Sequence, residues 1–368
     1  MTASTLPSSS IVNEDSVSVN NDRQPELDIA RGLSVVFMVT VHFFQQYAAP
    51  HVEHSLPGTI LFYLAGPPVA PILMFLMGAG TVYSRKQQFG LQLLRGIKLI
   101  GLGYLLSLVS WVLPKVVALQ TGRYAPEVFF HYFRDLSAFA LQINILQFAG
   151  LALIFLALCR LTGISRNWFP LIALAVSLQA PFLWGNYPRN AVLNYLIEPL
   201  WGDRVWVRFP LYGWVVYPLM GAWFGEHLRS ATDKRSFYFT MLKFGAAGII
   251  AGLGIAMLFG RFSLLGDMDV YFKRHSIEGH CCILSFVIIW ISALFFIHGK
   301  LPSVITARLA FWSRYITVIY VIHGLLIGWG ILLLRAFGLG TPAVFAGILL
   351  MLAAVDVLCR LYDRVVKH

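Results

Sequence analysis

Charged residues are scarce in this chain. Only 12% of its 368 residues are Asp, Glu, Lys or Arg, and 58% are hydrophobic, whereas a soluble domain carries about 25% charged residues. So few ionisable side chains cannot cover a water-exposed surface, which excludes an ordinary soluble globular protein. We therefore expect the lipid bilayer to be the main solvent of the chain.

Cysteine is also rare, and its spacing carries no ligand pattern. The chain has four cysteines, none of them in a Cys-x-x-Cys arrangement: Cys159, Cys281, Cys282 and Cys359. All lie in or beside apolar runs, where a free cysteine behaves as a small packing residue. This pattern argues against a disulfide framework and a zinc framework, and no metal site is expected.

Acidic residues are fewer than basic ones, and the formal net charge is +11. The basic residues do not form the single patch, interleaved with aromatic residues, that is typical of a nucleic-acid-binding surface. They separate apolar runs instead, as the positive-inside rule requires. We therefore expect a partner in the lipid bilayer and none among nucleic acids.

The first 25 residues are rich in Ser and Asn and contain almost no large apolar side chain. This composition predicts a disordered tail, residues 1–25, on the cytoplasmic side. A basic segment followed by an apolar core and a cleavage site is missing, so we expect no cleaved signal peptide. Residues 26–368 are expected to form a single transmembrane domain.

Apolar runs of membrane-spanning length recur along this domain. The ten runs are Leu27–Tyr47, Thr59–Tyr83, Leu93–Leu113, Leu136–Cys159, Trp168–Trp184, Phe209–Gly225, Phe237–Phe259, Cys281–Ile297, Phe311–Leu334 and Thr341–Leu361. Each is near the roughly 20 residues that span a bilayer as a helix. The second run contains Gly66 and three prolines, and we expect a break there.

An even number of spans puts both termini on one side, and most Lys and Arg residues then fall on that side. Lys115 and Arg208 are among the minority in the opposite, outer connections. The predicted fold is an all-α polytopic helical bundle of about ten spans, with both termini in the cytoplasm. No convincing internal repeat is evident, which disfavours the common transporter architectures.

The first span carries polar residues at informative positions. Asp28 and Arg31 are three residues apart and neighbour each other on a helix, where they could be no more than an interfacial ion pair. His42 lies three turns beyond Arg31 on nearly the same face, roughly 16 Å along the axis. An ionisable group at that depth marks a cavity or pathway, and a histidine there can act as a general base. The alternative is an interhelical hydrogen bond.

These residues resemble a known pattern. Arg31, ten intervening residues and His42 are similar to the first-helix R-x10-H pattern of acyltransferase family three. The run ELDIARGLSVVFMVTVHF, residues 26–43, also resembles the opening of bacterial membrane proteins similar to heparan-α-glucosaminide N-acetyltransferase. That resemblance continues in GPPVAPILMFLMGAGTVYS (66–84), INILQFAGLAL (143–153) and SRYITVIYVIHGLLIG (313–328).

The resemblance implies a function. Both families transfer acyl groups from coenzyme A donors to acceptors on the far side of the membrane. It implies that His42 activates the acceptor or relays the acyl group, and that Arg31, beside Asp28, helps to hold the phosphates of the donor. Acetyl-coenzyme A is then a co-substrate, and no cofactor is permanently bound. The acceptor would be a hydroxyl or amine of an envelope glycan or similar molecule, at a bacterial cytoplasmic (inner) membrane.

The sequence departs from the heparan-type enzyme at one position. There the residue matching His42 is an asparagine, and the reactive histidine lies in the following loop. An ungapped count lands on Glu53, between His51 and His54. His54, together with His51, is therefore a second candidate base, although loop histidines are often ordinary solvated residues. His42 is favoured because it fits the other family's pattern without a gap.

Further polar residues are candidates for binding the donor or the acceptor. Asn144 and Gln147 form a pair three residues apart, and Tyr320 and His323 form another in the ninth run, where Ser313, Thr317 and Gly324 continue a small, polar face. Each pair either lines a tunnel or serves helix packing. Arg85 and Lys86 in a cytoplasmic loop would attract an anionic nucleotide, although orientation alone also explains them.

Two other functions remain open. A transporter or flippase would use Asp28, Arg31, His42 and His323 as a substrate or proton pathway. A non-catalytic subunit would recognise only lipid or protein partners. Whether the chain forms a homo-oligomer is open as well.

Overall fold

The chain is helical throughout the part that the computed structural model describes, which comprises residues 22–66, 68–84, 87–122, 127, 136–188, 190–204, 206–259, 275–333 and 338–367. The helices of the first half are α1 Pro25–Tyr47, α2 Pro50–Glu53, α3 Leu56–Ala65, α4 Val69–Tyr83, α5 Phe89–Ser107, the π-helix η1 Leu108–Val112, α6 Leu113–Gln120, α8 Leu136–Ala140, α9 Ile145–Leu161, η2 Arg166–Trp168 and α10 Phe169–Leu183. The second half contains α11 Ala191–Trp201, α12 Leu211–Trp214, α13 Val216–Ser230, α14 Lys234–Leu258, α16 Ile277–Ile297, η3 His298–Lys300, α17 Ser303–Arg314, α18 Ile316–Leu333 and α19 Thr341–Lys367.

The predicted all-α class is confirmed for these residues, which contain only two isolated β-bridges besides the helices. Residues 1–21 of the predicted tail lie outside the described residues, as do Arg85 and Lys86 of the predicted donor site. Helix α1 already begins at Pro25.

Among the described residues, six helical stretches are long and apolar enough to cross a membrane: Pro25–Tyr47, Leu56–Tyr83, Phe89–Gln120, Lys234–Leu258, Ile277–Lys300 and Thr341–Lys367. The bent pair α17 and α18 raises this number to seven if it counts as one span. Side chains such as Ile250 and Leu350, both 72% exposed, point outward from α14 and α19. Exposed aliphatic faces of this extent are compatible with lipid and not with water. The chain is a polytopic membrane protein; ten spans and their orientation stay predictions.

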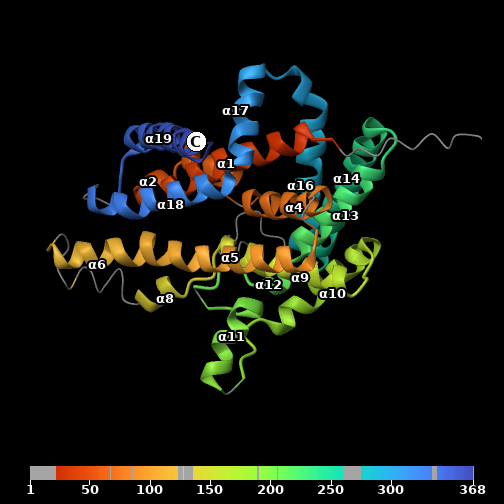
Figure 1. Cartoon of the computed structure of the whole chain (residues 1–368), viewed down its shortest axis with the longest axis horizontal. Helices are drawn as coiled ribbons and strands as arrows, with labels where there is room; N and C mark the ends of the chain where they lie inside the picture. Colours follow the sequence, from red (N-terminus) through yellow and green to blue (C-terminus); the bar gives the residue numbers. More distant parts are fainter. Residues whose placement is uncertain are drawn as a thin grey trace, which may run out of the picture.

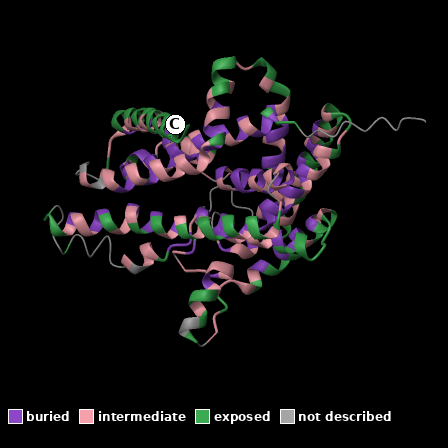
Figure 2. Cartoon of the chain, viewed as in Figure 1, coloured by how far each residue is buried: buried purple, intermediate pink, exposed green. Residues whose placement is uncertain are grey.

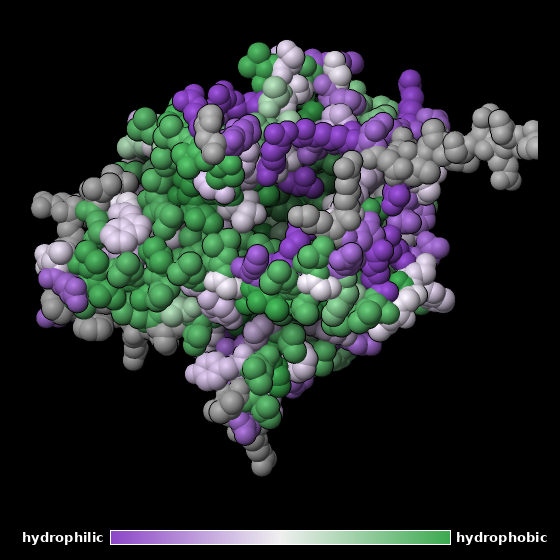
Figure 3. All heavy atoms as spheres, viewed as in Figure 1, coloured by the Kyte–Doolittle hydropathy of each residue, from purple (hydrophilic) through white to green (hydrophobic). Residues whose placement is uncertain are grey.

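Polar and apolar surfaces are separated along the molecule. Figure 3 shows apolar side chains over much of the broad face and polar ones gathering at the end where α1 begins and α13 meets α14. Figure 2 shows that burial is concentrated in α1, α4 and α13, whereas α19 is exposed along much of its length. This distribution matches a bundle whose core is protein and whose periphery is lipid.

Helix α1 is the central element. It contacts α3, α4, α16, α17, α18 and α19, as its position in Figure 1 indicates. Three small or β-branched residues on it, Ala30, Val35 and Val39, have no exposed surface. Any polar side chain on α1 must therefore face a neighbouring helix or an internal cavity, because most of its circumference is covered.

Glycines bring α4 and α13 into backbone contact. A Cβ atom at Gly78 would lie 2.0 Å from the Pro218 carbonyl oxygen, and one at Gly221 would lie 1.9 Å from the Phe75 carbonyl oxygen. Side chains therefore cannot occupy either position while the helices keep this separation. Small residues that allow close approach are the usual basis of helix association in a membrane, where no hydrophobic effect drives it.

Four predicted helical runs are interrupted. In the run Phe209–Gly225 the long helix α13 begins only at Val216, after a kink at Tyr212 and Gly213. The expected break in the run Thr59–Tyr83 is confirmed at Gly66, between α3 and α4. The run Leu136–Cys159 is not one helix, because residues 141–144 separate α8 from α9. The run Phe311–Leu334 was also wrong as a single helix, since α17 and α18 meet at 82° around Tyr315. Ser313 therefore belongs to α17 and is not on one helix face with Thr317 and Tyr320.

We expect Gly221→Ala to destabilise the protein by about 1–3 kcal/mol, because the added methyl group forces two packed helices apart. Gly101→Ala is the matched control: its Cβ atom would have no neighbour within 4 Å, and alanine is the better helix former. The thermal unfolding midpoint in detergent should fall for the first variant alone. Equal midpoints would contradict the close contact between α4 and α13.

Candidate active site

Three adjoining cavities follow the polar face of α1. The histidine cavity, of about 280 Å³, is lined by His42, Gln45, Gln46, Gly103, Leu106, Ser107, Trp111, Lys115, Phe139, Gln142, Asn144, Leu146, Gln147, Arg208, Tyr320, His323, Gly324 and Ile327. The middle cavity, of about 190 Å³, shares His42, Gln45, Asn144, Arg208 and Tyr320 with it. The arginine cavity, of about 450 Å³, has Arg31 in its wall and shares Met38, Leu73, Ile145 and Tyr320 with the middle cavity.

Tyr320 lines all three cavities. The series therefore runs from Arg31, in the second turn of α1, to His42 near the end of the same helix. The spacing of eleven residues between Arg31 and His42 predicts that both lie on this face of α1. Both residues do face internal cavities, and one tyrosine on α18 stands where the cavities adjoin.

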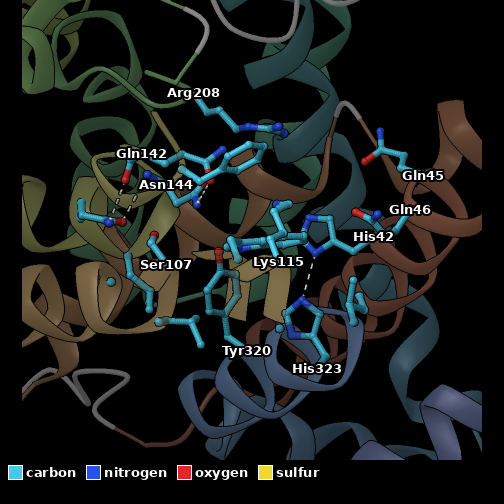
Figure 4. A pocket seen from close by; sticks show the side chains of 18 residues that line it. His42, Gln45, Gln46, Ser107, Lys115, Gln142, Asn144, Arg208, Tyr320 and His323 are labelled. Carbon is cyan, nitrogen blue, oxygen red and sulfur yellow. Dashed lines mark hydrogen bonds between the residues drawn. The ribbon is translucent and has the colours of Figure 1, made fainter. Parts of the chain in front are cut away.

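His42 is paired with His323. The Nδ1 atom of His42 lies 2.9 Å from Nε2 of His323, and the two rings are nearly parallel, with centroids 5.2 Å apart. Figure 4 shows this pair, one ring from α1 and the other from α18, beside Tyr320. The edge of the Tyr320 ring meets His323 at a centroid distance of 5.2 Å. A hydrogen bond between residues 281 positions apart thus joins two helices at the cavity wall.

The surroundings of the pair determine the tautomers. Nδ1 of His323 lies 3.0 Å from the carbonyl oxygen of Ile319. A carbonyl oxygen only accepts, so this nitrogen carries the proton and donates. Nε2 of neutral His323 is then an acceptor, and Nδ1 of His42 must donate to it. The remaining nitrogen of neutral His42, Nε2, therefore has a free lone pair at the cavity.

Arg31 is held at the other end of the series by several polar groups. Its Nη1 atom lies 3.5 Å from Asp28 Oδ1 and donates to Ser313 Oγ at 3.2 Å, and Nη2 donates to the Leu76 carbonyl at 3.1 Å. Ser313 Oγ donates to Asp28 Oδ1 at 2.8 Å. The predicted contact of Asp28 with Arg31 is therefore present. The hydrogen bonds to Ser313 and to the Leu76 carbonyl tie α1 to the end of α17 and to α4.

Asn144 and Gln147 owe their spacing to a helix start. The Gln147 side-chain oxygen accepts from the Asn144 backbone N–H at 3.2 Å, and Asn144 precedes the first residue of α9. This is one half of a capping box, so Asn144 lies before the helix and only Gln147 lies within it. The side chains of Gln147 and Asn144 also donate, at 3.0 Å each, to the backbone and side-chain oxygens of Gln142. Both predicted residues do line the histidine cavity.

A short bridge places Arg208 opposite this amide cluster. The Ile143 N–H donates to the Trp206 carbonyl at 2.9 Å, and the Arg208 N–H donates to the Ile143 carbonyl at 3.1 Å. The segment before α12 is thereby fixed beside residues 142–144. Arg208 lines both the histidine and the middle cavities as a result.

Sequence reasoning missed two cations of the histidine cavity. Both were assigned to outer connections, Lys115 because the third run was ended at Leu113 and Arg208 because the sixth run was begun at Phe209. The structure instead continues α5 through the π-helix η1 into α6, so that Ser107, Trp111 and Lys115 recur every fourth residue along one wall. A lysine so close to an apolar run was the available signal.

The loop histidines lie elsewhere. His51 and Glu53 belong to the one-turn helix α2, and His54 caps it. His51 and His54 are exposed, and neither is among the residues that line the three cavities. Partial burial raises the pKa of the Glu53 carboxyl group. Of the two candidate bases, the structure brings only His42 together with Asn144, Gln147, Tyr320 and His323.

Comparison with known proteins identifies a family for most of the chain. The family described as "Heparan-alpha-glucosaminide N-acetyltransferase, catalytic" matches residues 23–266, more than half of the chain. No curated protein matches the chain. The matched segment contains Arg31, His42, Lys115, Asn144 and Arg208, whereas Tyr320 and His323 follow it. The chain therefore belongs to the family of heparan-alpha-glucosaminide N-acetyltransferase catalytic domains and is a membrane acetyltransferase.

Proposed function

We propose that this protein transfers an acetyl group from cytoplasmic acetyl-coenzyme A to a hydroxyl or amine of an envelope glycan or similar acceptor at the far side of a bacterial inner membrane. His42 is the general base. Arg31 belongs to the donor side of the site, and Tyr320 and His323 form the wall between donor and acceptor. The observation that carries this proposal is the chain of contacts from the Ile319 carbonyl through His323 to Nδ1 of His42, which leaves Nε2 of neutral His42 as an acceptor at the histidine cavity.

The reaction needs one proton carrier between acceptor and leaving group. Nε2 of His42 takes the proton of the acceptor O–H or N–H as the acceptor atom attacks the thioester carbonyl carbon. The tetrahedral intermediate then collapses with cleavage of the C–S bond. The thiolate leaves and recovers the proton from His42, which yields the acetylated acceptor and free coenzyme A. Throughout, Nδ1 of His42 keeps donating to His323, so the imidazolium stage remains hydrogen-bonded.

The arginine cavity suits the donor. It is the largest of the three, and Arg31 and Arg95 line it together with Thr81, Ser84 and Gln92. No acidic side chain is among the described residues of its wall. Arg85 and Lys86 directly follow Ser84 in the sequence, and we propose that they add positive charge near the arginine cavity. An anionic nucleotide is attracted by such a field, and its thioester arm could extend past Tyr320 toward His42.

We expect His42→Ala to lower the rate of acetyl transfer by roughly 10²–10⁴-fold, the usual contribution of a general base. The Michaelis constant for acetyl-coenzyme A should change little, because the donor cavity is intact. His54→Ala is the matched control and should retain the wild-type rate, since its side chain is outside the cavities. The measurement is transfer of label from radiolabelled acetyl-coenzyme A in purified membranes supplied with glycan acceptors.

If His54→Ala instead lost activity and His42→Ala kept the wild-type rate, the general base would be the loop histidine His54 and not His42. If wild-type protein consumes no thioester but moves a solute or protons across proteoliposomes, the chain is a transporter and the enzyme proposal fails. Full complementation of a deletion strain by His42→Ala would instead indicate a non-catalytic subunit.

His323 acts through His42, and its substitution separates positioning from packing. We expect His323→Ala to reduce the turnover number by on the order of 10²-fold or more, because His42 is then free to carry its proton on Nε2. His323→Gln should recover much of the activity, since its amide oxygen can accept from Nδ1 of His42. Both variants should keep the wild-type Michaelis constant for acetyl-coenzyme A. Equal losses in both variants would contradict the role in fixing the tautomer.

A further inference from the structure

Tyr320 occupies the place where the three cavities adjoin. Among the described residues it alone lines the histidine, middle and arginine cavities. Leu146 is shared by the histidine and arginine cavities, and Arg208 by the histidine and middle cavities, but neither of them lines all three. In the proposed reaction the thioester comes from the arginine cavity and the acceptor lies in the histidine cavity. The new bond therefore forms beside this tyrosine.

Packing on α18 fixes the ring of Tyr320. Tyr320 and His323 are three residues apart and neighbour each other on the helix surface. The edge of the tyrosine ring meets the histidine ring at an interplanar angle of 74°. His323 is itself hydrogen-bonded to His42. The contacts that orient the proposed base thus also orient the phenol, and a polar group that is already in place needs no reorganisation when charge develops in a reaction.

The hydroxyl group of Tyr320 faces the cavity. Figure 4 shows the ring extending from α18 with its oxygen atom directed away from the helix, into the space between the lining side chains. Other buried tyrosines use their hydroxyl groups inside the protein: that of Tyr47 donates to the Ile327 carbonyl, and that of Tyr238 donates to Glu26. Among the described residues no such bond engages the Tyr320 hydroxyl. It can therefore donate to a substrate.

Acetyl transfer requires such a donor. As the acceptor attacks the thioester, negative charge develops on the carbonyl oxygen, and an N–H or O–H group must stabilise it. Backbone N–H groups do not serve here, because His42 and Tyr320 lie inside α1 and α18, where these groups are bonded within the helix. The donor at the junction of the cavities must be a side chain.

The other polar side chains are less suitable. The amides of Asn144 and Gln147 already donate to Gln142. Gln45 and Arg208 line the histidine and middle cavities but not the arginine cavity, from which the thioester comes. The remaining described donors of the histidine cavity line that cavity alone. Tyr320 is the donor that both substrates reach.

We infer that the Tyr320 hydroxyl donates a hydrogen bond to the thioester carbonyl oxygen and stabilises the oxyanion of the tetrahedral intermediate. This inference rests on the proposed function. When the acceptor atom bonds to the carbonyl carbon, the π electron pair moves to the oxygen, and the phenol donates to that oxygen while keeping its proton. Collapse returns the pair to the C=O bond and breaks the C–S bond. His42 carries the proton of the reaction, and Tyr320 stabilises its negative charge.

We expect Tyr320→Phe to lower the turnover number by roughly 10²–10³-fold, the usual effect of removing one oxyanion donor. The Michaelis constant for acetyl-coenzyme A should change little, because the ring and its contact with His323 are kept. Tyr104→Phe is the matched control. It removes the same hydroxyl from a tyrosine of α5 that lines none of the three cavities, and it should keep the wild-type rate of transfer from radiolabelled acetyl-coenzyme A.

Infrared spectroscopy separates this role from packing. Acetyl-coenzyme A labelled with ¹³C at the carbonyl is bound to purified protein without acceptor, and its C=O stretch is measured. The stretch should lie at higher wavenumber in Tyr320→Phe than in wild-type protein, because a hydrogen bond that polarises the carbonyl is lost. Tyr104→Phe should match the wild type. A wild-type turnover number in Tyr320→Phe, or a loss of turnover with an unmoved stretch, overturns the inference.

The two measurements also distinguish the inference from the proposed function. If Tyr320→Phe shifts the carbonyl stretch but wild-type protein acetylates no acceptor, the proposed function fails and the contact of Tyr320 with the carbonyl stands. If wild-type protein transfers acetyl groups and Tyr320→Phe equals it in both rate and carbonyl stretch, the function stands and the role of Tyr320 fails.

Discussion

The hydrogen bond from His42 to His323 is the constraint on which the proposed chemistry depends. It joins α1 to α18 across 281 residues, and the Ile319 carbonyl fixes its direction through His323. A histidine alone in a membrane cavity could carry its proton on either ring nitrogen. Here a backbone oxygen, which can only accept, determines both tautomers in turn. The position of a main-chain group thus prepares the proposed base, and no carboxylate is among the described residues that line the histidine cavity.

The packing around this pair explains why a cavity exists. Glycines such as Gly78 and Gly221 let α4 and α13 touch through their backbones, and α5 packs closely on α9. Helices held that tightly leave little space between them, so the polar side chains of α1, α6 and α18 share the space that remains. In a bilayer each of these groups needs a partner or water. Collecting them around one cavity satisfies this need and also creates the site.

The line from Arg31 to His42 could be predicted from sequence, because both residues lie on one helix. Helical periodicity places Arg31 and His42 on one face whatever the rest of the fold does. The partner of His42 could not be predicted in the same way, since periodicity says which face a residue occupies and not which helix lies opposite. Lys115 was missed for a local reason. The third run was ended at Leu113, but the helix continues through the π-helix η1 into α6 and carries the lysine to the cavity wall. Asn144 and Gln147 were found, although their spacing reflects a helix cap.

The cavity series is asymmetric, and the asymmetry fits a reaction between substrates from opposite sides. The arginine cavity is larger than the histidine cavity, about 450 Å³ against about 280 Å³, and Tyr320 stands in the wall of both. A through-going pore would leak protons and ions. In the proposed mechanism a thioester arm and an acceptor meet at His42 beside this tyrosine, and neither substrate needs to cross the membrane. Transport demands the reverse, a site that opens to each side in turn. The hydrogen bond between His42 and His323 ties α1 to α18, the two helices that such opening would have to separate, and this favours transfer over transport.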